Sequence, residues 1–130
     1  MAFFQPKIKL FVKGRKETFS ILSKSIQKDD SVIWVHVASL GEFEQGLPVI
    51  EKLKAQYPLY KIVISFFSPS GYEVKKNSAV ADAIVYLPID TIGNAKRFIN
   101  TINPKVAIFV KYEIWPNYLK VLAENNIPTI

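Results

Sequence analysis

Short apolar runs alternate with longer segments of helical character from residue 31 onward, and this alternation limits the possible folds more than any other feature. The apolar runs are rich in β-branched residues and cover residues 32–37, 61–66, 83–87 and 105–110, with a fifth beginning at 129–130. Helical composition is found between them, at 43–56, 71–80, 92–102 and 116–125. Apolar strands that alternate with helices are typical of a parallel sheet covered on both sides. The sequence therefore predicts an α/β fold, a Rossmann-like parallel sheet with helices on both faces.

The chain divides into a lead-in segment and one domain. Apolar residues recur at helical spacing over residues 17–27, which predicts a short amphipathic helix. We therefore expect residues 1–28 to form a basic lead-in segment that contains this helix, and residues 29–130 to form one Rossmann-like domain. Because residues 128–130 have the character of a strand that has just begun, we expect this domain to be truncated at its C-terminus.

All of the net charge of +6 lies in the first 28 residues, which carry seven basic side chains and one acidic one. The remaining 102 residues carry ten of each sign. A basic segment interleaved with apolar residues fits an anionic membrane surface, although a solvated basic arm fits equally well. Nucleic acid is not an expected partner, because the rest of the chain has no basic excess to follow a phosphate backbone.

The lack of cysteine and the single histidine exclude several kinds of site. Without cysteine there is no disulfide, thiolate nucleophile or cysteine metal ligand, and one histidine cannot form a histidine cluster. We expect neither a metal site nor a bound cofactor. No stretch reaches the roughly 18 consecutive apolar residues of a membrane-spanning helix, so the chain as given is expected to be soluble or peripheral.

Four segments that join a strand to the following helix are the candidate ligand-binding segments. In an open parallel sheet, ligands bind beyond the carboxyl ends of the strands. The four segments are dense in Ser, Gly, Pro, Asp and Glu and read HVASLGE (36–42), SFFSPSG (65–71), PIDT (88–91) and KYEIWPN (111–117). Because the fold places the ends of parallel strands side by side, we expect these segments to form one edge.

Glu42 in the first segment has two interpretations. A carboxylate on a short loop at a helix start can act as a general base that takes a proton from a sugar hydroxyl. Ser39 and Glu42 also have the spacing of a capping box, in which both side chains bind backbone N–H groups at a helix start. Spacing alone favours the cap. Ser70 and Glu73 share this spacing, and there too the cap is the favoured interpretation.

Three further features of these segments have more than one explanation. Glu113 lies among aromatic residues without cap spacing, so it is either functional or an ion-pair partner of Lys111. His36 ends a buried strand and is expected to be a core histidine rather than a ligand. The segment 65–71 could hold phosphate or sugar hydroxyls with its backbone amides, or could be a plain turn.

Four motifs occur together and in this order: HVASLGEFEQGLPVI (36–50), SFFSPSGYE (65–73), YLPID (86–90) and VKYEIWPN (110–117). They resemble the N-terminal domain of the transferases of 3-deoxy-D-manno-octulosonic acid (Kdo), which add this sugar to the lipid A precursor of lipopolysaccharide. The similarity covers nearly everything from about Lys7 to Ile130. It implies the N-terminal half of a GT-B glycosyltransferase, in which this domain takes the lipid acceptor, lipid IVA, and an absent C-terminal domain takes CMP-Kdo.

The resemblance also implies site residues and a mechanism. The family's Ser-x-Gly-Glu carboxylate, the base in an inverting and metal-independent transfer, falls on Glu42, and a second family carboxylate falls on Glu113. Acceptor-binding or supporting positions are then Ser39, Gly41, Ser70, Gly71, Glu113 and Asn117. The full-length enzyme is expected at the cytoplasmic face of the bacterial inner membrane, and this chain alone is expected to be inactive.

Two other functions fit the same residues. One is a different GT-B transferase that uses a nucleotide sugar and a lipid or glycan acceptor. The other is a non-enzymatic module that binds a membrane or a protein partner. In that module the acidic residues of the four segments would serve only as helix caps.

Overall fold

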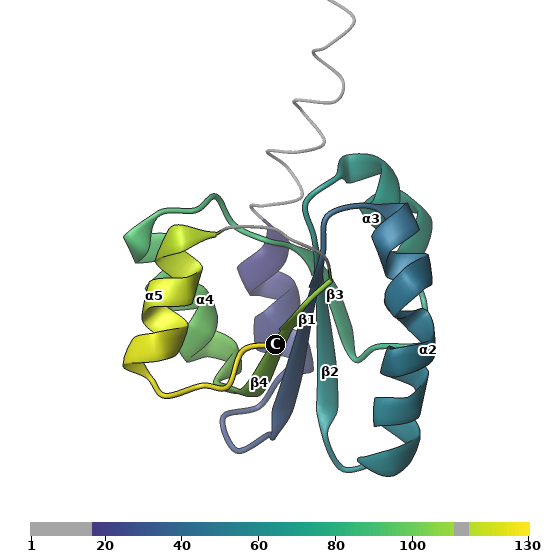
Figure 1. The fold of residues 1–130 in the computed structure, drawn as a ribbon, viewed down its shortest axis with the longest axis horizontal. Helices are drawn as coiled ribbons and strands as arrows, with labels where there is room; N and C mark the ends of the chain where they lie inside the picture. Colours follow the sequence, from purple (N-terminus) through teal and green to yellow (C-terminus); the bar gives the residue numbers. More distant parts are fainter. Residues whose placement is uncertain (1–16, 111–114) are drawn as a thin grey trace, which may run out of the picture.

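A computed structural model describes residues 17–110 and 115–130 (Figure 1). Residues 17–25 are helical, and residues 31–110 and 115–130 then alternate between strand and helix as predicted. The elements are β1 (Val32–Val37), α2 (Leu40–Gln56), β2 (Lys61–Phe66), α3 (Pro69–Lys75), β3 (Ala83–Tyr86), α4 (Ile92–Ile102), β4 (Pro104–Phe109) and α5 (Pro116–Glu124).

The predicted bounds are correct to the residue for β1, β2 and α4, whereas α3 is shorter than expected. The prediction extended this helix to Val80, but it ends at Lys75. The next residues form turns, in which Ser78 N donates to Lys75 O at 2.8 Å and Val80 N donates to Ser78 Oγ at 3.3 Å. Asn and Ser side chains compete with helix formation in this way, and Asn77-Ser78 supplies both.

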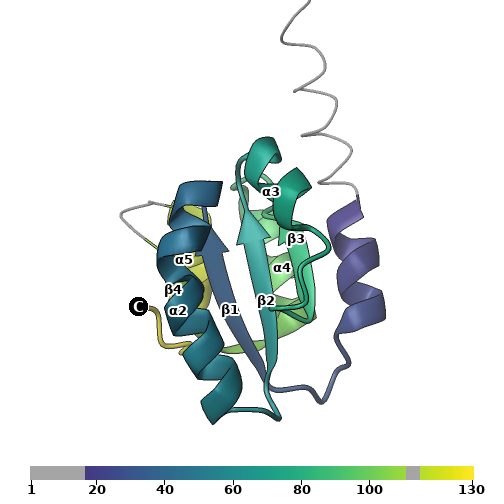
Figure 2. The same cartoon turned by 90° about the vertical axis from the view of Figure 1, so that its right-hand side faces the viewer.

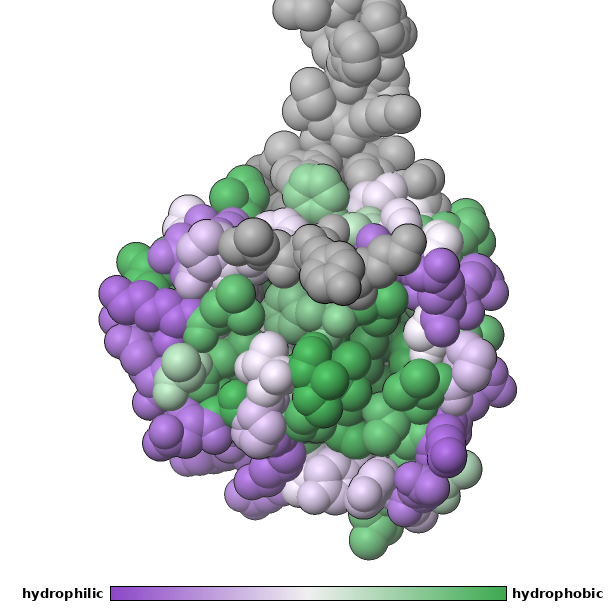
Figure 3. All heavy atoms as spheres, in the orientation of Figure 1, coloured by the Kyte–Doolittle hydropathy of each residue, from purple (hydrophilic) through white to green (hydrophobic). Residues whose placement is uncertain are grey.

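The described strands form a four-stranded parallel sheet in the order β3-β2-β1-β4. Thr129 then pairs in parallel with Ala107 of β4, and Ile130 N donates to Ala107 O at 2.8 Å. The chain therefore places its last residues beside β4, as the expected fifth strand would lie. Figure 3 has the orientation of Figure 1, and the centre of this face, in the region of β4 and the last residues, is apolar.

Helices cover both faces of this sheet, so the predicted fold class is confirmed. The helical residues 17–25, α4 and α5 bury one apolar cluster, which includes Leu22, Trp34 and Phe98. On the other face α2 and α3 bury a second cluster around Phe43 and Phe66. Figure 2 shows α2 and α3 in front of the sheet and the N-terminal helical residues beside β3. The alternation of side chains along each strand supplies both clusters.

Candidate functional site

The segment after β1 forms a helix cap with Glu42 as one of its partners. Ser39 is the N-cap of α2, with extended backbone (φ −145°, ψ 171°), and its Oγ accepts from Glu42 N at 3.5 Å. Glu42 Oε1 accepts from the backbone N–H of Ala38 at 2.6 Å. The capping interaction is therefore present, although the carboxylate reaches Ala38 rather than the N–H of the N-cap residue itself.

This geometry leaves one oxygen of the carboxylate available at the edge of the sheet. Glu42 is half-buried, and within residues 17–110 and 115–130 its side chain makes one hydrogen bond, the one from Ala38 N. Oε1 is held by Ala38, whereas Oε2 has no hydrogen-bond partner among these residues. A cap and a base are thus compatible roles, because one oxygen orients the group while the other can take a proton.

The segment after β2 is built differently, and the prediction that Ser70 caps a helix is wrong. The helix begins two residues earlier than predicted, at Pro69, so its N-cap is Ser68 and Ser70 is a residue of the helix. Proline is favoured at a first helical position because its missing N–H would be unpaired there and its φ is already helical. Glu73 is exposed, and its carboxylate lies 3.3 Å from Lys76 Nζ.

Tyr72, in the same helix, points into the core rather than toward the edge. It is 6% exposed, and its ring stacks on Tyr86 with centroids 4.2 Å apart. Burial raises the pKa of the Tyr72 phenol, and the charges of Glu17 and Glu73 raise it further. This residue therefore contributes packing to the second segment.

The first two segments are in direct contact. Phe67 N donates to Val37 O at 3.3 Å, and Ser68 N donates to Ala38 O at 2.8 Å. These two amides are bound to the protein itself, which leaves the plain turn as the interpretation of this part of the 65–71 segment. The expectation that the fold brings the segments side by side is confirmed for these two.

The two predicted glycines differ in how much the structure needs them. A Cβ on Gly71 would lie 2.9 Å from Leu40 N and 3.0 Å from the ring of Phe66, so only glycine lets α3 approach the start of α2 this closely. Gly41 is exposed, and a Cβ there would come no nearer than 3.9 Å to Ser39 Oγ. Gly71 therefore has a packing role, whereas packing does not explain Gly41.

Asn117 joins the third and fourth segments. Its Nδ2 donates to Asp90 O at 3.0 Å, and its backbone N donates to Asp90 Oδ1 at 3.2 Å. Next to it, Tyr118 donates from its hydroxyl to Pro88 O at 2.7 Å. These bonds hold Asn117 against the third segment. The remaining candidate, Glu113, and its possible partner Lys111 lie outside the described residues.

A buried polar network underlies this edge, and sequence reasoning identified only one of its members. His36 is 0% exposed, which confirms it as a core histidine. Its Nδ1 lies 2.8 Å from Ser65 Oγ, which also accepts from Trp34 Nε1 at 2.8 Å. His36 and Ser65 are register partners on β1 and β2. A histidine and a serine near the ends of adjacent predicted strands were the available signal for this pair.

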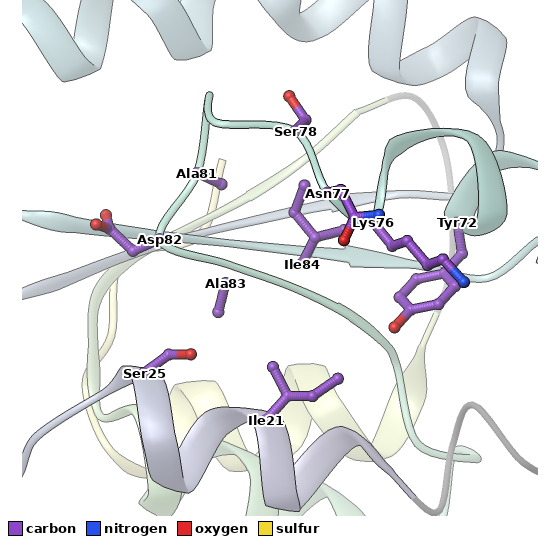
Figure 4. A pocket seen from close by; sticks show the side chains of 10 residues that line it. All are labelled: Ile21, Ser25, Tyr72, Lys76, Asn77, Ser78, Ala81, Asp82, Ala83 and Ile84. Carbon is purple, nitrogen blue, oxygen red and sulfur yellow. The ribbon is translucent and has the colours of Figure 1, made fainter.

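Residues 17–110 and 115–130 contain no group of three His, Cys, Asp or Glu side chains that could hold a metal ion. Over the same residues, no helix has the length and apolar character needed to cross a bilayer. A pocket of about 370 Å³ lies between Ile21 and Ser25 of the N-terminal helix and the chain from Lys76 to Asp82 (Figure 4). Its lining includes none of the candidate residues.

The fold and the edge define a class of protein: an α/β domain with a parallel sheet whose carboxyl edge presents a half-buried, oriented carboxylate. Residues 13–130 match the family described as 3-deoxy-D-manno-octulosonic-acid transferase (kdotransferase). The chain belongs to this family, and its fold is consistent with the N-terminal domain of a glycosyltransferase.

Individual relatives agree with this assignment. The chain is 36% identical over 100 residues to a 3-deoxy-D-manno-octulosonic acid transferase of Haemophilus influenzae, which covers 75% of this chain and 23% of the relative. It is 35% identical over 97 residues to the transferase of the same name from Aquifex aeolicus, covering 74% and 27%. A bifunctional glycosyltransferase/methyltransferase of Fusobacterium nucleatum is 32% identical over 130 residues, covering 95% and 19%. The chain thus spans only a fifth to a quarter of these relatives.

Proposed function

We propose that the full-length protein transfers Kdo from CMP-Kdo to a glucosamine hydroxyl of a lipid A precursor, lipid IVA, and that this chain is its acceptor side. The observation that carries the proposal is the Glu42 carboxylate, which lies at the carboxyl edge of the sheet with Oε1 bound to Ala38 N, while residues 17–110 and 115–130 make no hydrogen bond to Oε2. Ligands of open parallel sheets bind at this edge. Membership of the Kdo transferase family supports the choice of sugar.

In the proposed reaction Glu42 acts as the general base. Its free oxygen takes the proton of the acceptor hydroxyl while the hydroxyl oxygen forms a bond to the anomeric carbon of Kdo. The bond from that carbon to the phosphate oxygen breaks at the same time, and CMP leaves with the electron pair. Attack opposite the leaving group inverts the anomeric carbon and needs no metal ion. Residues beyond this chain hold CMP-Kdo, so the chain alone has no donor to act on.

The remaining candidates keep this arrangement in place. Ser39 caps the helix that carries Glu42, and Gly71 lets α3 pack against the start of that helix. Asn117 joins the third and fourth segments. Gly41, Ser70 and Glu113 are proposed to contact or support the acceptor, as their places in the family motifs indicate. The proposed location is the cytoplasmic face of the inner membrane, where the excess basic charge of residues 1–28 would meet anionic lipid.

An assay of the full-length protein tests this function. CMP-Kdo and other sugar nucleotides are offered in turn with the lipid A precursor, with and without a chelator, and the anomeric configuration of the product is determined. We expect transfer from CMP-Kdo with inversion, unaffected by the chelator. Transfer from another nucleotide sugar instead would favour a different GT-B transferase, and loss of transfer on chelation would refute metal independence.

A second experiment tests the proposed membrane contact by measuring binding of the protein to anionic vesicles with and without residues 1–16. Unchanged binding after the deletion would remove the membrane role of that segment.

A further inference from the structure

Phe67 and Trp115 form an aromatic pair at the carboxyl edge of the sheet. Phe67 directly follows β2 and is 42% exposed, and Trp115 is half-buried at the start of α5. Their ring centroids lie 5.6 Å apart, with the planes inclined by 55°. We call these two residues the aromatic shelf. An apolar surface of this kind, placed where ligands of parallel sheets bind, is suited to a ligand with an apolar face.

Both members of the shelf are fixed in place by the protein. The ring of Trp115 packs edge-on against His36, with centroids 5.3 Å apart and an interplanar angle of 82°. His36 is itself held by Ser65 Oγ, so the buried network fixes the imidazole ring against which Trp115 packs. Phe67 is held through its backbone N–H, which donates to Val37 O. A surface that is already ordered loses little conformational entropy when a ligand binds to it.

The shelf lies next to the proposed base. Phe67 and the following residue donate to Val37 O and Ala38 O, and Ala38 N in turn donates to Glu42 Oε1. Two hydrogen bonds therefore join the backbone at Phe67 to residues 37 and 38, and a third joins Ala38 to the carboxylate. A sugar whose hydroxyl reaches Glu42 has its ring within a few ångströms of that carboxylate, and the exposed Phe67 belongs to the segment bonded to the same turn.

We propose that the aromatic shelf binds the apolar face of the acceptor's sugar ring beside Glu42. This inference rests on the proposed function and specifies which residues hold the acceptor. One face of a pyranose ring presents C–H groups, which are apolar and weakly positive. The face of an aromatic ring carries the negative part of its quadrupole, so the two surfaces attract each other while the sugar hydroxyls remain free for hydrogen bonds.

The chain offers a matched control at the opposite edge of the sheet. Tyr57 and Tyr60, between α2 and β2, also form a ring pair, with centroids 5.5 Å apart and planes inclined by 59°. Tyr57 is 47% exposed, which is close to the value for Phe67. The two pairs thus share geometry and exposure, and they differ in which end of the strands they occupy.

The test measures acceptor kinetics of the full-length enzyme with Phe67→Leu, Phe67→Tyr and Tyr57→Leu. Leucine keeps the apolar volume but removes the flat ring, whereas tyrosine keeps the ring. We expect Phe67→Leu to raise KM for the acceptor about threefold to tenfold, in line with an aromatic contact of ~0.5–1.5 kcal/mol, with kcat and the KM for CMP-Kdo nearly unchanged. Phe67→Tyr and Tyr57→Leu should both stay within twofold of wild type.

Two acceptors separate a sugar ring from an acyl chain as the bound group. The same rise in KM with the acylated lipid and with its deacylated glucosamine disaccharide supports the shelf as a sugar subsite. A rise confined to the acylated lipid would show that the shelf binds acyl chains and would overturn the proposal. No rise with either acceptor, or an equal rise in Tyr57→Leu, would also overturn it.

A binding measurement separates the shelf from the proposed function. Calorimetric titration of the deacylated disaccharide into the full-length protein needs no CMP-Kdo and no transfer. Weaker binding by Phe67→Leu, restored in Phe67→Tyr, supports the shelf even if the transferred sugar is not Kdo. Equal binding by the wild type and by Phe67→Leu, or no binding by either, would refute the shelf. Failure of Kdo transfer alone would count against the proposed function only.

Discussion

Two segments of this chain share the spacing Ser-x-x-Glu, yet the structure uses them in different ways. In the first, Ser39 is the N-cap of α2 and the Glu42 carboxylate turns back onto the backbone at Ala38. In the second, the helix begins before Ser70, and Glu73 is exposed beside Lys76. The same two residue types thus produce an oriented, half-buried carboxylate in one case and a solvated surface charge in the other.

The difference arises from where each helix starts. No proline precedes Glu42 in the first segment, so Ser39 can take the N-cap position, and the glutamate at N3 faces the chain entering the helix. In the second segment Pro69 occupies the first helical position, which moves the start of the helix and turns Glu73 away from the entering chain. Of these two segments, the first therefore aims its glutamate at the carboxyl edge of the sheet, and the second does not.

The largest expected effect comes from neutralising each glutamate in the full-length enzyme. Glutamine keeps the shape of the side chain and an oxygen that can accept from Ala38 N, but it cannot take a proton. We expect Glu42→Gln to lower kcat by about 10²- to 10⁴-fold, the usual contribution of a general base. Glu73→Gln should leave kcat within twofold. Steady-state transfer assays, with circular dichroism to confirm folding, measure both.

A folded Glu42→Gln enzyme with near-normal turnover would refute the base assignment. If the same variant lost only a few degrees of melting temperature, as the loss of about 1 kcal/mol produces in a domain of this size, the capping box would be the whole role of Glu42.

The glycines of the two segments give the next largest effect, this time on stability. We expect Gly71→Ala to destabilise the start of α3 by about 1–3 kcal/mol, because its Cβ would press on Leu40 N and on the ring of Phe66. Gly41→Ala occupies open space at the start of α2, so its effect should lie between neutral and about 1 kcal/mol of stabilisation. Hydrogen exchange of residues 66–75 and 38–45, followed by mass spectrometry, measures both locally.

The expected signature is faster exchange in Gly71→Ala, by about tenfold to a hundredfold, with unchanged or slower exchange in Gly41→Ala. Equal protection in Gly71→Ala and the wild type would mean that the two helices separate at little cost, and the contact between the two segments would then not position Glu42.

Much of this fold could be predicted because the signal is local. Apolar β-branched runs bounded by polar segments located β1 and β2 to the residue, and the rule that parallel strands end at one edge brought the candidate segments together. The start of α3 was missed because two local signals compete there, and the proline at Pro69 outweighs the Ser-x-x-Glu spacing.

The site depends on contacts that no local pattern encodes. The bonds from Asn117 to Asp90 and the Ser65 partner of His36 depend on strand register and on how distant segments meet, whereas the bond from Ala38 N to Glu42 Oε1 is local and differs from the capping-box expectation only in which N–H it binds. Asn117 and Asp90 are 27 residues apart in sequence, and the partners in the buried network are 29 and 31 apart. Residue types could therefore nominate Glu42, whereas the availability of Oε2 required the folded chain.

The smallest expected effect concerns the strength of the cap that holds Glu42. The bond from Glu42 N to Ser39 Oγ is 3.5 Å long, whereas the equivalent bond at α4, from Asn94 N to Thr91 Oγ1, is 3.1 Å. Hydrogen bonds weaken with distance, so Ser39→Ala should cost about 0.5 kcal/mol and Thr91→Ala about 1 kcal/mol. Hydrogen exchange of the first turn of each helix measures the two costs in one experiment. If Ser39→Ala proved the more costly, the cap on Glu42 N would be the stronger of the two, which would contradict the expected order. Glu42 would then be held firmly at two points: Ser39 Oγ would bind its backbone N–H, and Ala38 N would bind its carboxylate.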